Sequence, residues 1–409
     1  MCGIIGYTGK RDALPIILSA LKKMEYRGYD SSGISIISSD KKISTIKSVG
    51  KIANLEEKLN GFNLKGTTAC GHQRWATHGE VTEENSHPHT DCFEKITVVH
   101  NGIIENYKEL KDELISNGHK FKSETDTEVL AHLIEDAKAK NQKGGIEESV
   151  SKALKRIQGA YGIIVLCEDE PEKIVAARMF SPLLLGIGEK ENLAASDSTA
   201  ITAYAKKIIY LDDGELAVLT PDHLNVFDLG RNKKEKAMHD LEIHAEDISK
   251  KGFETFMIKE INEQPEAIIN STRGRLTPEE GKTVLGGLRE MSREIASAKR
   301  IIITACGTAY FAGCVGEYML EEYAGIPVEV DLASEFRYRK PVFQKGDILI
   351  AISQSGETAD TIAAIREAKE KRIPAFGIVN AVGSTIARDT DAGVYQHVGP
   401  EIGVASTKA

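Results

Sequence analysis

Hydrophobic and polar positions follow two different patterns along the chain, and the change falls after residue 240. In the first part, short runs rich in β-branched residues alternate with segments whose apolar residues have helical spacing, as Leu14, Ile17, Leu18 and Leu21 do. The runs predict strands at 34–37, 96–99, 162–166, 208–211 and 216–219. The spacing predicts helices at 11–24, 107–117, 127–140 and 146–157. We therefore expect a strand-rich, layered α/β domain over 1–240.

The second part repeats a simpler unit of strand, small-residue loop and helix. A charged stretch at 228–251 indicates a solvated boundary, and 253–270 has the pattern of a helix. The apolar run 301–304 is followed by ACGTAY, and the run 348–352 by SQSGET and a helical stretch at 359–371. A further strand is predicted at 376–379. Because strands that alternate with helices form parallel sheets, 241–409 is predicted to be an α/β domain with a parallel sheet.

Composition narrows the function classes. A chain of 409 residues suggests two or three domains, and its net charge of −9, with no basic stripe, argues against binding to nucleic acid or anionic membranes. The apolar runs are too short to span a bilayer, and no signal peptide is visible at the N-terminus. The six cysteines form no CxxC pair and are typical of reduced thiols. We expect a cytoplasmic enzyme.

The N-terminus, MCGIIGYTG, offers unusual chemistry. Removal of the initiator methionine would leave the thiol and the α-amine of Cys2 on the same residue. A free α-amine has a pKa of about 7.7–8.0, so a sizeable fraction is unprotonated near neutral pH. Such an amine can accept the thiol proton and so activate a nucleophile without a histidine. The alternative is that Cys2 is simply a small residue at the start of a strand.

Four further strings favour the nucleophile. They are EYRGYDSSG (25–33), HQRWATHG (72–79), VVHNGIIEN (98–106) and SETDTE (123–128). Together with MCGIIGY, they resemble the glutaminase domain of the class II glutamine amidotransferases, which are N-terminal-nucleophile hydrolases. The resemblance extends over about the first 240 residues and implies an αββα sandwich that hydrolyses glutamine.

The resemblance assigns the reaction chemistry to three residues. Cys2 would be the nucleophile. Asn101 and Gly102 end the strand predicted at 96–99, where a side-chain amide and a backbone N–H can point at one oxygen. They would form the oxyanion hole, in which loss of one donor typically costs about 3–4 kcal/mol of barrier.

The resemblance also implies how free glutamine is selected. Arg74 can bind the α-carboxylate through two parallel hydrogen bonds, and Asp126 can pair with the α-ammonium. Trp75 and His78 would lie on a loop that covers the pocket, and Arg27 would fix the N-terminal segment. Taken singly, Asn-Gly is typical of a turn, Arg-Trp of a surface cation–π contact, and Asp126 of a helix cap.

A zinc site is the rival interpretation of the same region. The candidate ligands lie within 23 residues and are Cys70, His72, His78, His87, His89 and Cys92. Except for His72 and His78, no pair of them has the spacing of a structural zinc motif, and the resemblance assigns the stretch to glutamine binding. We therefore expect no metal and no cofactor.

The second part resembles the sugar-isomerase (SIS) domains, αβα sandwiches whose signature is similar to SQSGETADT. Short hydroxyl-rich loops at helix N-termini bind phosphate without positive charge. The residues implied in sugar-phosphate binding are Thr308, Ser353, Gln354, Ser355, Thr358 and Ser406. Ser355 or Thr358 could instead be an ordinary N-cap.

A glutaminase followed by an SIS domain, with EFRYRK (335–340) and EIGVASTKA (401–409), is similar to the glucosamine-6-phosphate synthase family. This implies the substrates glutamine and fructose 6-phosphate, the first step of the hexosamine pathway, and a homodimer. Ala309 departs from the family, which often has serine there. A sugar-phosphate-binding regulator with a vestigial glutaminase is the alternative from another class. An asparagine-synthetase type would need an ATP-pyrophosphatase loop, which the sequence lacks.

The resemblance places the isomerase base and the imine-forming lysine in segments that would follow Ala409. The loops SQSGET and ACGTAY offer hydroxyls and backbone donors, which are poor bases near neutral pH. General catalysis needs a base within about 3 Å of the reacting carbons. A polypeptide of residues 1–409 is therefore expected to release ammonia from glutamine but to form no glucosamine 6-phosphate. Separate assays of ammonia and amino sugar test this, and amino-sugar product from this polypeptide would refute it.

Overall fold

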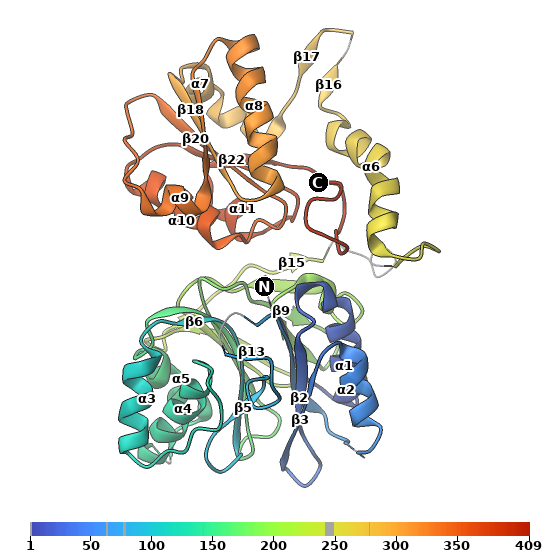
Figure 1. The fold of residues 1–409 in the computed structure, drawn as a ribbon, viewed down its shortest axis with the longest axis vertical. Coiled ribbons are helices and arrows are strands. Elements are labelled where there is room, and N and C mark those ends of the chain that lie inside the picture. The colour runs from blue at the N-terminus through green and yellow to red at the C-terminus, as the bar shows by residue number, and fades with distance from the viewer. Residues whose placement is uncertain (1, 63, 77–78, 142, 242–248, 278) are drawn as a thin grey trace. The chain divides into compact units, whose positions relative to one another are not determined.

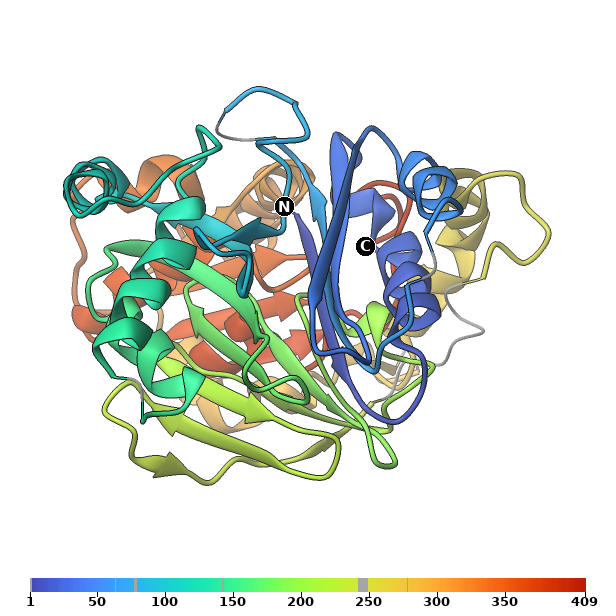
Figure 2. The same cartoon turned by 90° about the horizontal axis from the view of Figure 1, so that it is seen from below.

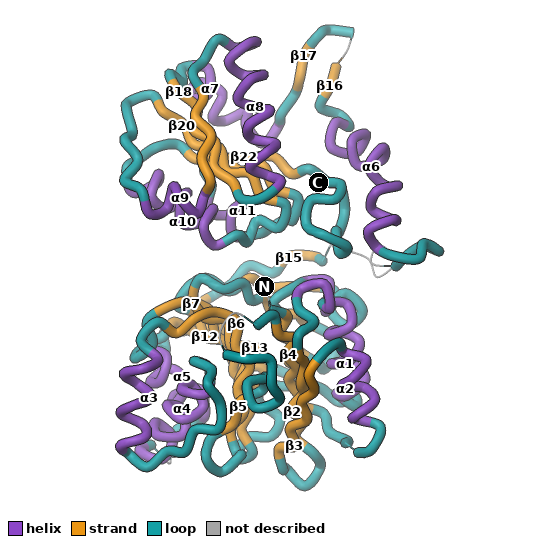
Figure 3. The backbone as a smooth tube through the Cα atoms, viewed as in Figure 1, coloured by secondary structure: helices purple, strands orange, loops and turns teal. Residues whose placement is uncertain are grey.

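The computed structural model describes residues 2–62, 64–76, 79–141, 143–241, 249–277 and 279–409. Contacts divide the chain into two compact units, Met1–Ile248 (unit 1) and Ser249–Ala409 (unit 2). Figures 1 and 3 show the helices and strands of each unit.

Two antiparallel sheets form the centre of unit 1. The first contains β1 (Gly3–Thr8), β2 (Ser31–Ile37), β3 (Ile43–Val49), β4 (Thr68–Arg74), β9 (Leu184–Ile187), β10 (Asn192–Ala195), β11 (Lys207–Tyr210) and β15 (His239–Asp240). The second contains β5 (His89–Thr90), β6 (Ile96–Ile104), β7 (Gly159–Cys167), β8 (Ile174–Met179), β12 (Glu215–Leu219), β13 (Leu224–Asp228) and β14 (Lys233–Lys234). Their orders are β15-β11-β9-β10-β1-β4-β2-β3 and β14-β13-β12-β8-β7-β6-β5.

Helices cover the outer face of each sheet (Figure 2). They are α1 (Ala13–Lys23) and α2 (Ile52–Leu59) on the first sheet, and α3 (Tyr107–Ser116), α4 (Glu128–Lys140) and α5 (Ile146–Leu154) on the second. Two 3-10 helices lie among the described residues of this unit, η1 (Glu25–Arg27) and η2 (Ser198–Ala200). Ile4, Val99 and Ile164 are fully buried between the two sheets. The predicted αββα sandwich is confirmed.

Helix α1 illustrates how the sequence pattern specifies these layers. Asp12 accepts a hydrogen bond from the Leu14 amide and caps the helix. Ile17 and Leu21, one turn apart, are fully buried against the sheet. The helical spacing in the sequence therefore becomes one apolar face.

Unit 2 is an αβα sandwich around a parallel sheet. Its strands β18 (Arg300–Ala305), β19 (Val328–Leu332), β20 (Asp347–Ser353), β21 (Ala375–Val379) and β22 (Ala392–Tyr395) lie in the order β19-β18-β20-β21-β22. The helices are α6 (Phe256–Thr272), α7 (Ser292–Ala296), α8 (Thr308–Ala324), α9 (Ala333–Tyr338), α10 (Ala359–Glu370) and α11 (Thr385–Asp389). The remaining elements are β16 (Leu276–Thr277), β17 (Lys282–Thr283) and η4 (Gly286–Met291). Helices α9, α10 and α11 share one apolar core with the sheet, and α7 and α8 share another.

The order of this sheet defines where a ligand would bind. From β18 the chain passes through α8 to β19 on one side, and β20 pairs with β18 on the other. Ala305 and Ile352 are partners in parallel register, so the loops that follow β18 and β20 lie next to each other. Such a switch point at the carboxyl ends of parallel strands is where open α/β sheets bind ligands.

One expectation about local structure is wrong. Asn101 and Gly102 do not end the strand predicted at 96–99, because β6 continues to Ile104 and pairs with β7 throughout. Gly102 has a φ of 139°, and a Cβ there would lie 2.0 Å from the Ala160 carbonyl oxygen. Glycine lets the strand continue past Asn101 where another residue would clash.

Among the described residues, no helix is long and apolar enough to cross a membrane.

Candidate active site

Cys2 directly precedes β1, the strand that lies between β10 and β4 in the first sheet. Its Sγ accepts a hydrogen bond from the Trp75 amide at 3.1 Å. Its carbonyl oxygen accepts one from Asn101 Nδ2 at 2.8 Å and one from Arg27 Nε at 3.3 Å. Three segments remote in sequence thus fix the position of this one residue, and the predicted residues Cys2, Asn101 and Arg27 are brought together.

The surroundings of the Cys2 thiol disfavour its thiolate form. Burial raises the pKa of the thiol, and the Trp75 amide and the positive charges of Arg27 and Arg74 offset this only in part. Because the thiolate is the reactive form, a thiol with a raised pKa needs a base beside it.

The amide of Asn101 lies at the centre of the predicted oxyanion hole. Asn101 is buried, and its Oδ1 has no hydrogen-bond partner among the described residues. Gly102 follows it in β6 with the positive φ described above. The side-chain amide of Asn101 therefore lies beside the backbone of Cys2, and Gly102 is the next residue of the strand.

Arg74 and Asp126 are both buried, Arg74 at the end of β4 and Asp126 just before α4. Arg74 ends β4 and donates to the carbonyl oxygens of Glu80 at 3.0 Å and Gly79 at 3.3 Å. Asp126 accepts a hydrogen bond from the Ile104 amide at 2.7 Å. Burial lowers the pKa of Arg74, and the charges of Cys2, Asp30 and Asp126 oppose this shift. Arg74 thus shares one electrostatic environment with Cys2 and Asp126.

Two further predicted residues lie on the segment after β4. Trp75 is 45% exposed and meets the Tyr29 ring edge-on, with centroids 5.5 Å apart. His78 lies outside the described residues. Gly28 permits the close approach of this segment, since a Cβ there would lie 2.8 Å from the Trp75 amide nitrogen.

Sequence reasoning missed the acidic partner of Arg27. Arg27 pairs with Asp197 at 2.7 Å, and the Tyr26 hydroxyl donates to the same carboxylate. Both side chains of the ion pair are largely buried, exposed by 11% and 12%. Asp197 comes from the loop after β10, 170 residues further along the chain. No local pattern marks it, and only the pairing of β10 with β1 brings it to Cys2.

The histidines considered as zinc ligands pack against one another instead. The rings of His72 and His87 stack with centroids 4.0 Å apart, and His89 lies edge-on to His87. Burial lowers the pKa of His72 to about 3 and that of His87 well below its usual range. Within the part of the chain that the structure describes, Cys70, His72, His87 and His89 belong to no converging group of ligand atoms. Cys92 belongs to a different group, described below.

In unit 2, the predicted sugar-phosphate residues lie mainly on the two loops at the switch point. Thr308 is exposed at the start of α8, and Thr358 precedes α10 without a side-chain capping bond. Ser353 Oγ lies 3.1 Å from Thr358 Oγ1 and accepts a hydrogen bond from the Gly356 amide.

The remaining predicted sugar-phosphate residues make different hydrogen bonds. Ser355 accepts a hydrogen bond from the Glu357 amide, and Gln354 is partly exposed between these serines. Ser406 lies on the C-terminal segment, where its amide donates to Glu401. Glu357 accepts from both the amide and the hydroxyl of Thr385, at 2.8 and 2.7 Å. The one carboxylate of SQSGET is therefore held by α11.

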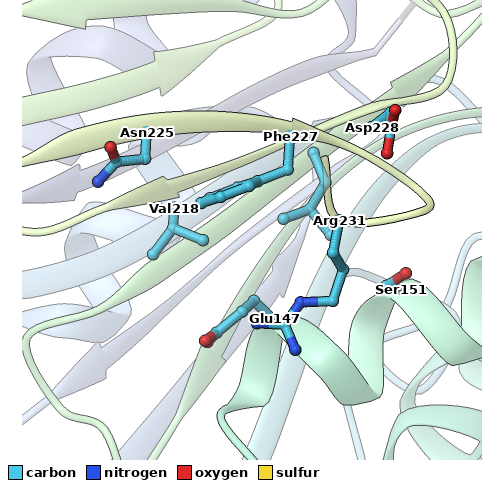
Figure 4. Close-up of a pocket in the computed structure, with 8 residues that line it drawn as sticks. Glu147, Ser151, Val218, Asn225, Phe227, Asp228 and Arg231 are labelled. Carbon is cyan, nitrogen blue, oxygen red and sulfur yellow. The ribbon is translucent and has the colours of Figure 1, made fainter. Parts of the chain in front are cut away.

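A small cavity of about 220 Å³ in unit 1 shares no residue with the cluster around Cys2 (Figure 4). It lies between α5 and the strands β12 and β13. Its lining residues are Glu147, Ser151, Leu216, Val218, Asn225, Phe227, Asp228 and Arg231.

The Arg27–Asp197 pair generates a prediction on stability. Asp197→Asn leaves a buried guanidinium uncompensated and should lower the free energy of unfolding by about 3–5 kcal/mol in chemical denaturation. Glu83→Gln is the control, because the Lys58–Glu83 pair is exposed and such pairs contribute about 1 kcal/mol or less. Equal effects of the two substitutions would contradict the role given to Asp197.

The same pair predicts a pH dependence. Burial raises the pKa of Asp197, but Arg27, Tyr26 and Thr199 together hold it below its usual value. Its contribution is therefore complete above the unfolded carboxyl pKa of about 3.9 and is lost as the pH falls below it. The Asp197→Asn variant should lose less stability than the unmodified protein between pH 5 and pH 3 (about two units around that pKa).

Family models match both units. Residues 72–203 match a glutamine amidotransferase domain, and residues 294–409 match an SIS domain.

Full-length relatives match the whole chain. The glutamine–fructose-6-phosphate aminotransferase (isomerizing) of Chlorobaculum tepidum is 50% identical over 412 aligned positions, which cover 100% of this chain and 67% of that protein. The enzyme of the same name from Methanosarcina mazei is 48% identical with the same coverage. The chain thus spans about two thirds of the length of these curated relatives (67%).

Among solved structures, the glutamine phosphoribosylpyrophosphate amidotransferase of B. subtilis is similar in fold. The match has a TM-score of 0.50 at 17% sequence identity, and it covers 97% of this chain and 90% of the B. subtilis chain.

Proposed function

The chain belongs to the glutamine–fructose-6-phosphate aminotransferase (isomerizing) family, and from this premise we propose how its residues divide the work. The full-length protein is a glutamine-dependent amidotransferase that delivers ammonia to fructose 6-phosphate, giving glucosamine 6-phosphate and glutamate, and residues 1–409 supply its glutaminase activity. Residues 1–240 form the glutaminase domain and residues 241–409 the first sugar-isomerase domain. The observation that carries the assignment of the glutaminase site is the convergence of Asn101, Arg27 and Trp75 on Cys2.

Glutamine hydrolysis begins at the Cys2 thiol. After removal of Met1, the α-amine of Cys2 accepts the thiol proton, and the thiolate attacks the side-chain amide carbon of glutamine. Collapse of the tetrahedral intermediate breaks the C–N bond, and the amine returns its proton to the leaving nitrogen, which departs as ammonia. Water then hydrolyses the thioester to glutamate. The raised pKa of the thiol supports a built-in base, because little thiolate forms without one.

Asn101 and Gly102 stabilise the tetrahedral oxyanion. Asn101 Nδ2 donates to the carbonyl oxygen of Cys2, so this amide already lies beside the nucleophile's backbone. When glutamine binds, the amide donor turns to the oxyanion together with the Gly102 N–H. Hydrogen-bond donors that stabilise a developing oxyanion typically contribute about 10²–10³-fold in rate each.

Arg74 and Asp126 select free glutamine over a peptide. Arg74 binds the α-carboxylate, and Asp126, whose carboxylate is oriented by the Ile104 amide, binds the α-ammonium. A glutamine within a peptide has neither charge. Trp75 and His78 cover the bound substrate, and the exposed Trp75 ring beside Tyr29 is suited to that role.

The switch point of unit 2 binds the sugar phosphate. Thr308, Ser353, Gln354, Ser355 and Thr358 supply hydroxyl, amide and backbone donors at the N-termini of α8 and α10, where phosphate binds without nearby basic residues. Ser406 contacts the sugar. The protein acts in the cytoplasm as a homodimer.

Substitution of the nucleophile tests the glutaminase site. Cys2→Ala should reduce ammonia release from glutamine to background, because it removes the sulfur that attacks the amide carbon. It should leave the far-UV circular dichroism unchanged. Cys314→Ser is the control, since Cys314 is also partly exposed and lies in unit 2. Full activity of Cys2→Ala would refute the mechanism.

Substrate selection is tested through the two charged residues. Arg74→Ala or Asp126→Asn should raise the KM for glutamine about 10- to 100-fold, because each leaves one substrate charge unpaired in a closed pocket. Arg156→Ala removes an arginine of an exposed ion pair and should not change KM. Unaltered glutamine kinetics in both variants would reassign Arg74 and Asp126 to structural roles.

A further inference from the structure

A second cluster of side chains in unit 1 shares no residue with the glutaminase site. It consists of Cys92, His119, His132 and Glu135, whose ligand atoms all lie within 4.8 Å of one another; we refer to it as the Cys92 cluster. Cys92 Sγ lies 3.5 Å from His119 Nδ1 and 3.6 Å from His132 Nδ1. Glu135 Oε2 lies 3.0 Å from His119 Nδ1 and 3.1 Å from His132 Nδ1.

These separations are close to the edges of a tetrahedral metal site. Bonds of about 2.3 Å to sulfur and about 2.0–2.1 Å to nitrogen or oxygen, at tetrahedral angles, place ligand atoms about 3.5 Å apart for S···N and about 3.3 Å for N···O. The measured S···N distances of 3.5 and 3.6 Å match, and the N···O distances of 3.0 and 3.1 Å are a few tenths of an ångström shorter. Binding of an ion requires a small outward adjustment of Glu135, and the two remaining pairs of ligand atoms, which lie within 4.8 Å of each other, must also come to tetrahedral spacing.

The outer nitrogen of each imidazole faces a carboxylate. His119 Nε2 lies 3.2 Å from Asp136 Oδ1, and His132 Nε2 lies 3.6 Å from Glu128 Oε1. A metal-bound histidine usually donates its other N–H to such a group, which fixes the tautomer with the inner nitrogen free to bind. Both carboxylates are themselves held in place, because Asp136 forms an ion pair with Lys140 and Glu128 accepts a hydrogen bond from the Lys122 amide.

Local backbone structure fixes the position of each of the four residues. His132 and Glu135 are one turn apart on α4, so they share a face. His119 follows the C-terminus of α3, where Gly118 has a φ of 96° and the His119 amide bonds back to the Leu114 carbonyl. Cys92 lies in the turn from β5 to β6, and its amide donates to Glu135 Oε2.

The two histidines of the Cys92 cluster are largely buried. The His132 side chain is 1% exposed and that of His119 9% exposed. Their rings lie with centroids 5.1 Å apart, and His132 Nε2 has no hydrogen-bond partner among the described residues. A divalent cation would give the sulfur, the two inner nitrogens and the Glu135 carboxylate one shared partner.

We propose that Cys92, His119, His132 and Glu135 bind one Zn²⁺ ion in a structural site. Zinc accepts this mixture of thiolate, imidazole and carboxylate, and a tetrahedral site filled by four protein ligands leaves no open position for catalysis. On binding, the Cys92 thiol loses its proton to solvent, and the thiolate and the Glu135 carboxylate neutralise the ion's two charges. This site replaces the expectation from sequence that the chain binds no metal.

The ion would join three segments of unit 1: the β5–β6 turn, the end of α3 and the middle of α4. Helix α4 begins two residues after Asp126, and β6 carries Asn101. The zinc therefore stabilises the segments that carry Asn101 and Asp126, and it does so without contacting the substrate.

Metal analysis of the unmodified protein, purified without chelators and desalted after exposure to ZnCl₂, tests the proposal. We expect about one zinc per chain. Cys92→Ser and His119→Gln should lower this content at least tenfold. Glu94→Gln is the matched control, because Glu94 is an exposed carboxylate of the same turn that pairs with Lys122, and its zinc content should not change. Absence of stoichiometric zinc from the unmodified protein would overturn the proposal, as would retention of full content in both ligand variants.

A spectroscopic measurement keeps the test decisive if a ligand variant fails to fold. Replacement of zinc by Co²⁺ in the unmodified protein should give the visible bands of a tetrahedral site and a near-ultraviolet thiolate-to-cobalt charge-transfer band. Prior alkylation of Cys92, verified by peptide mapping, should abolish the charge-transfer band. Chelation should lower the Tm of the unmodified protein, since an ion that binds only the folded state stabilises it. Octahedral cobalt spectra, or a Tm that chelation leaves unchanged, would overturn the structural role.

Discussion

The backbone of Cys2 is the point on which the glutaminase site depends. An N-terminal nucleophile needs its thiol and α-amine at one place, yet a chain terminus has no preceding residue to hold it. Here the carbonyl oxygen of Cys2 accepts hydrogen bonds from Asn101 and Arg27, and its sulfur accepts one from the Trp75 amide. Arg27 is itself fixed by the buried carboxylate of Asp197. A nucleophile within a chain is held in place by the residues before and after it. Cys2 is held in place by these tertiary contacts instead.

In both units, most of the residues to which we assign a function lie at the ends of strands. In unit 1, β1 and β4 lie next to each other, so Cys2 and Arg74 project from adjacent strands, and β6 of the other sheet supplies Asn101. In unit 2, β18 and β20 pair in parallel, which brings the two hydroxyl-rich loops together at a switch point. A rigid sheet with variable loops at its edge is a common way to combine precise positions with room for substrate.

Much of this could be predicted from the sequence, because the signals are local. Apolar periodicity located α1, α4 and α10 to within a few residues, and the strings around Cys2 and Asn101 indicated the chemistry. Groups joined only by tertiary pairing could not be found in this way. Asp197 reaches Arg27 because β10 pairs with β1, and His119 reaches Cys92 because Gly118 turns the chain after α3. The Cys92 cluster could not be predicted for the same reason, since the 23 residues from Cys70 to Cys92 contain none of the three groups that surround the Cys92 sulfur. Asn101-Gly102 was misplaced at a strand end because its pairing with β7 is also non-local.

The thiol of an N-terminal Cys2 is, in our proposal, the nucleophile of glutamine hydrolysis. Covalent trapping with a glutamine analogue that carries a diazoketone in place of the amide, followed by mass spectrometry of the peptides, tests this directly. We predict one adduct per chain, on the sulfur of a peptide that begins at Cys2 and lacks Met1, with free glutamine protecting against it. An adduct on any other cysteine, or equal labelling of chains that retain Met1, would contradict it.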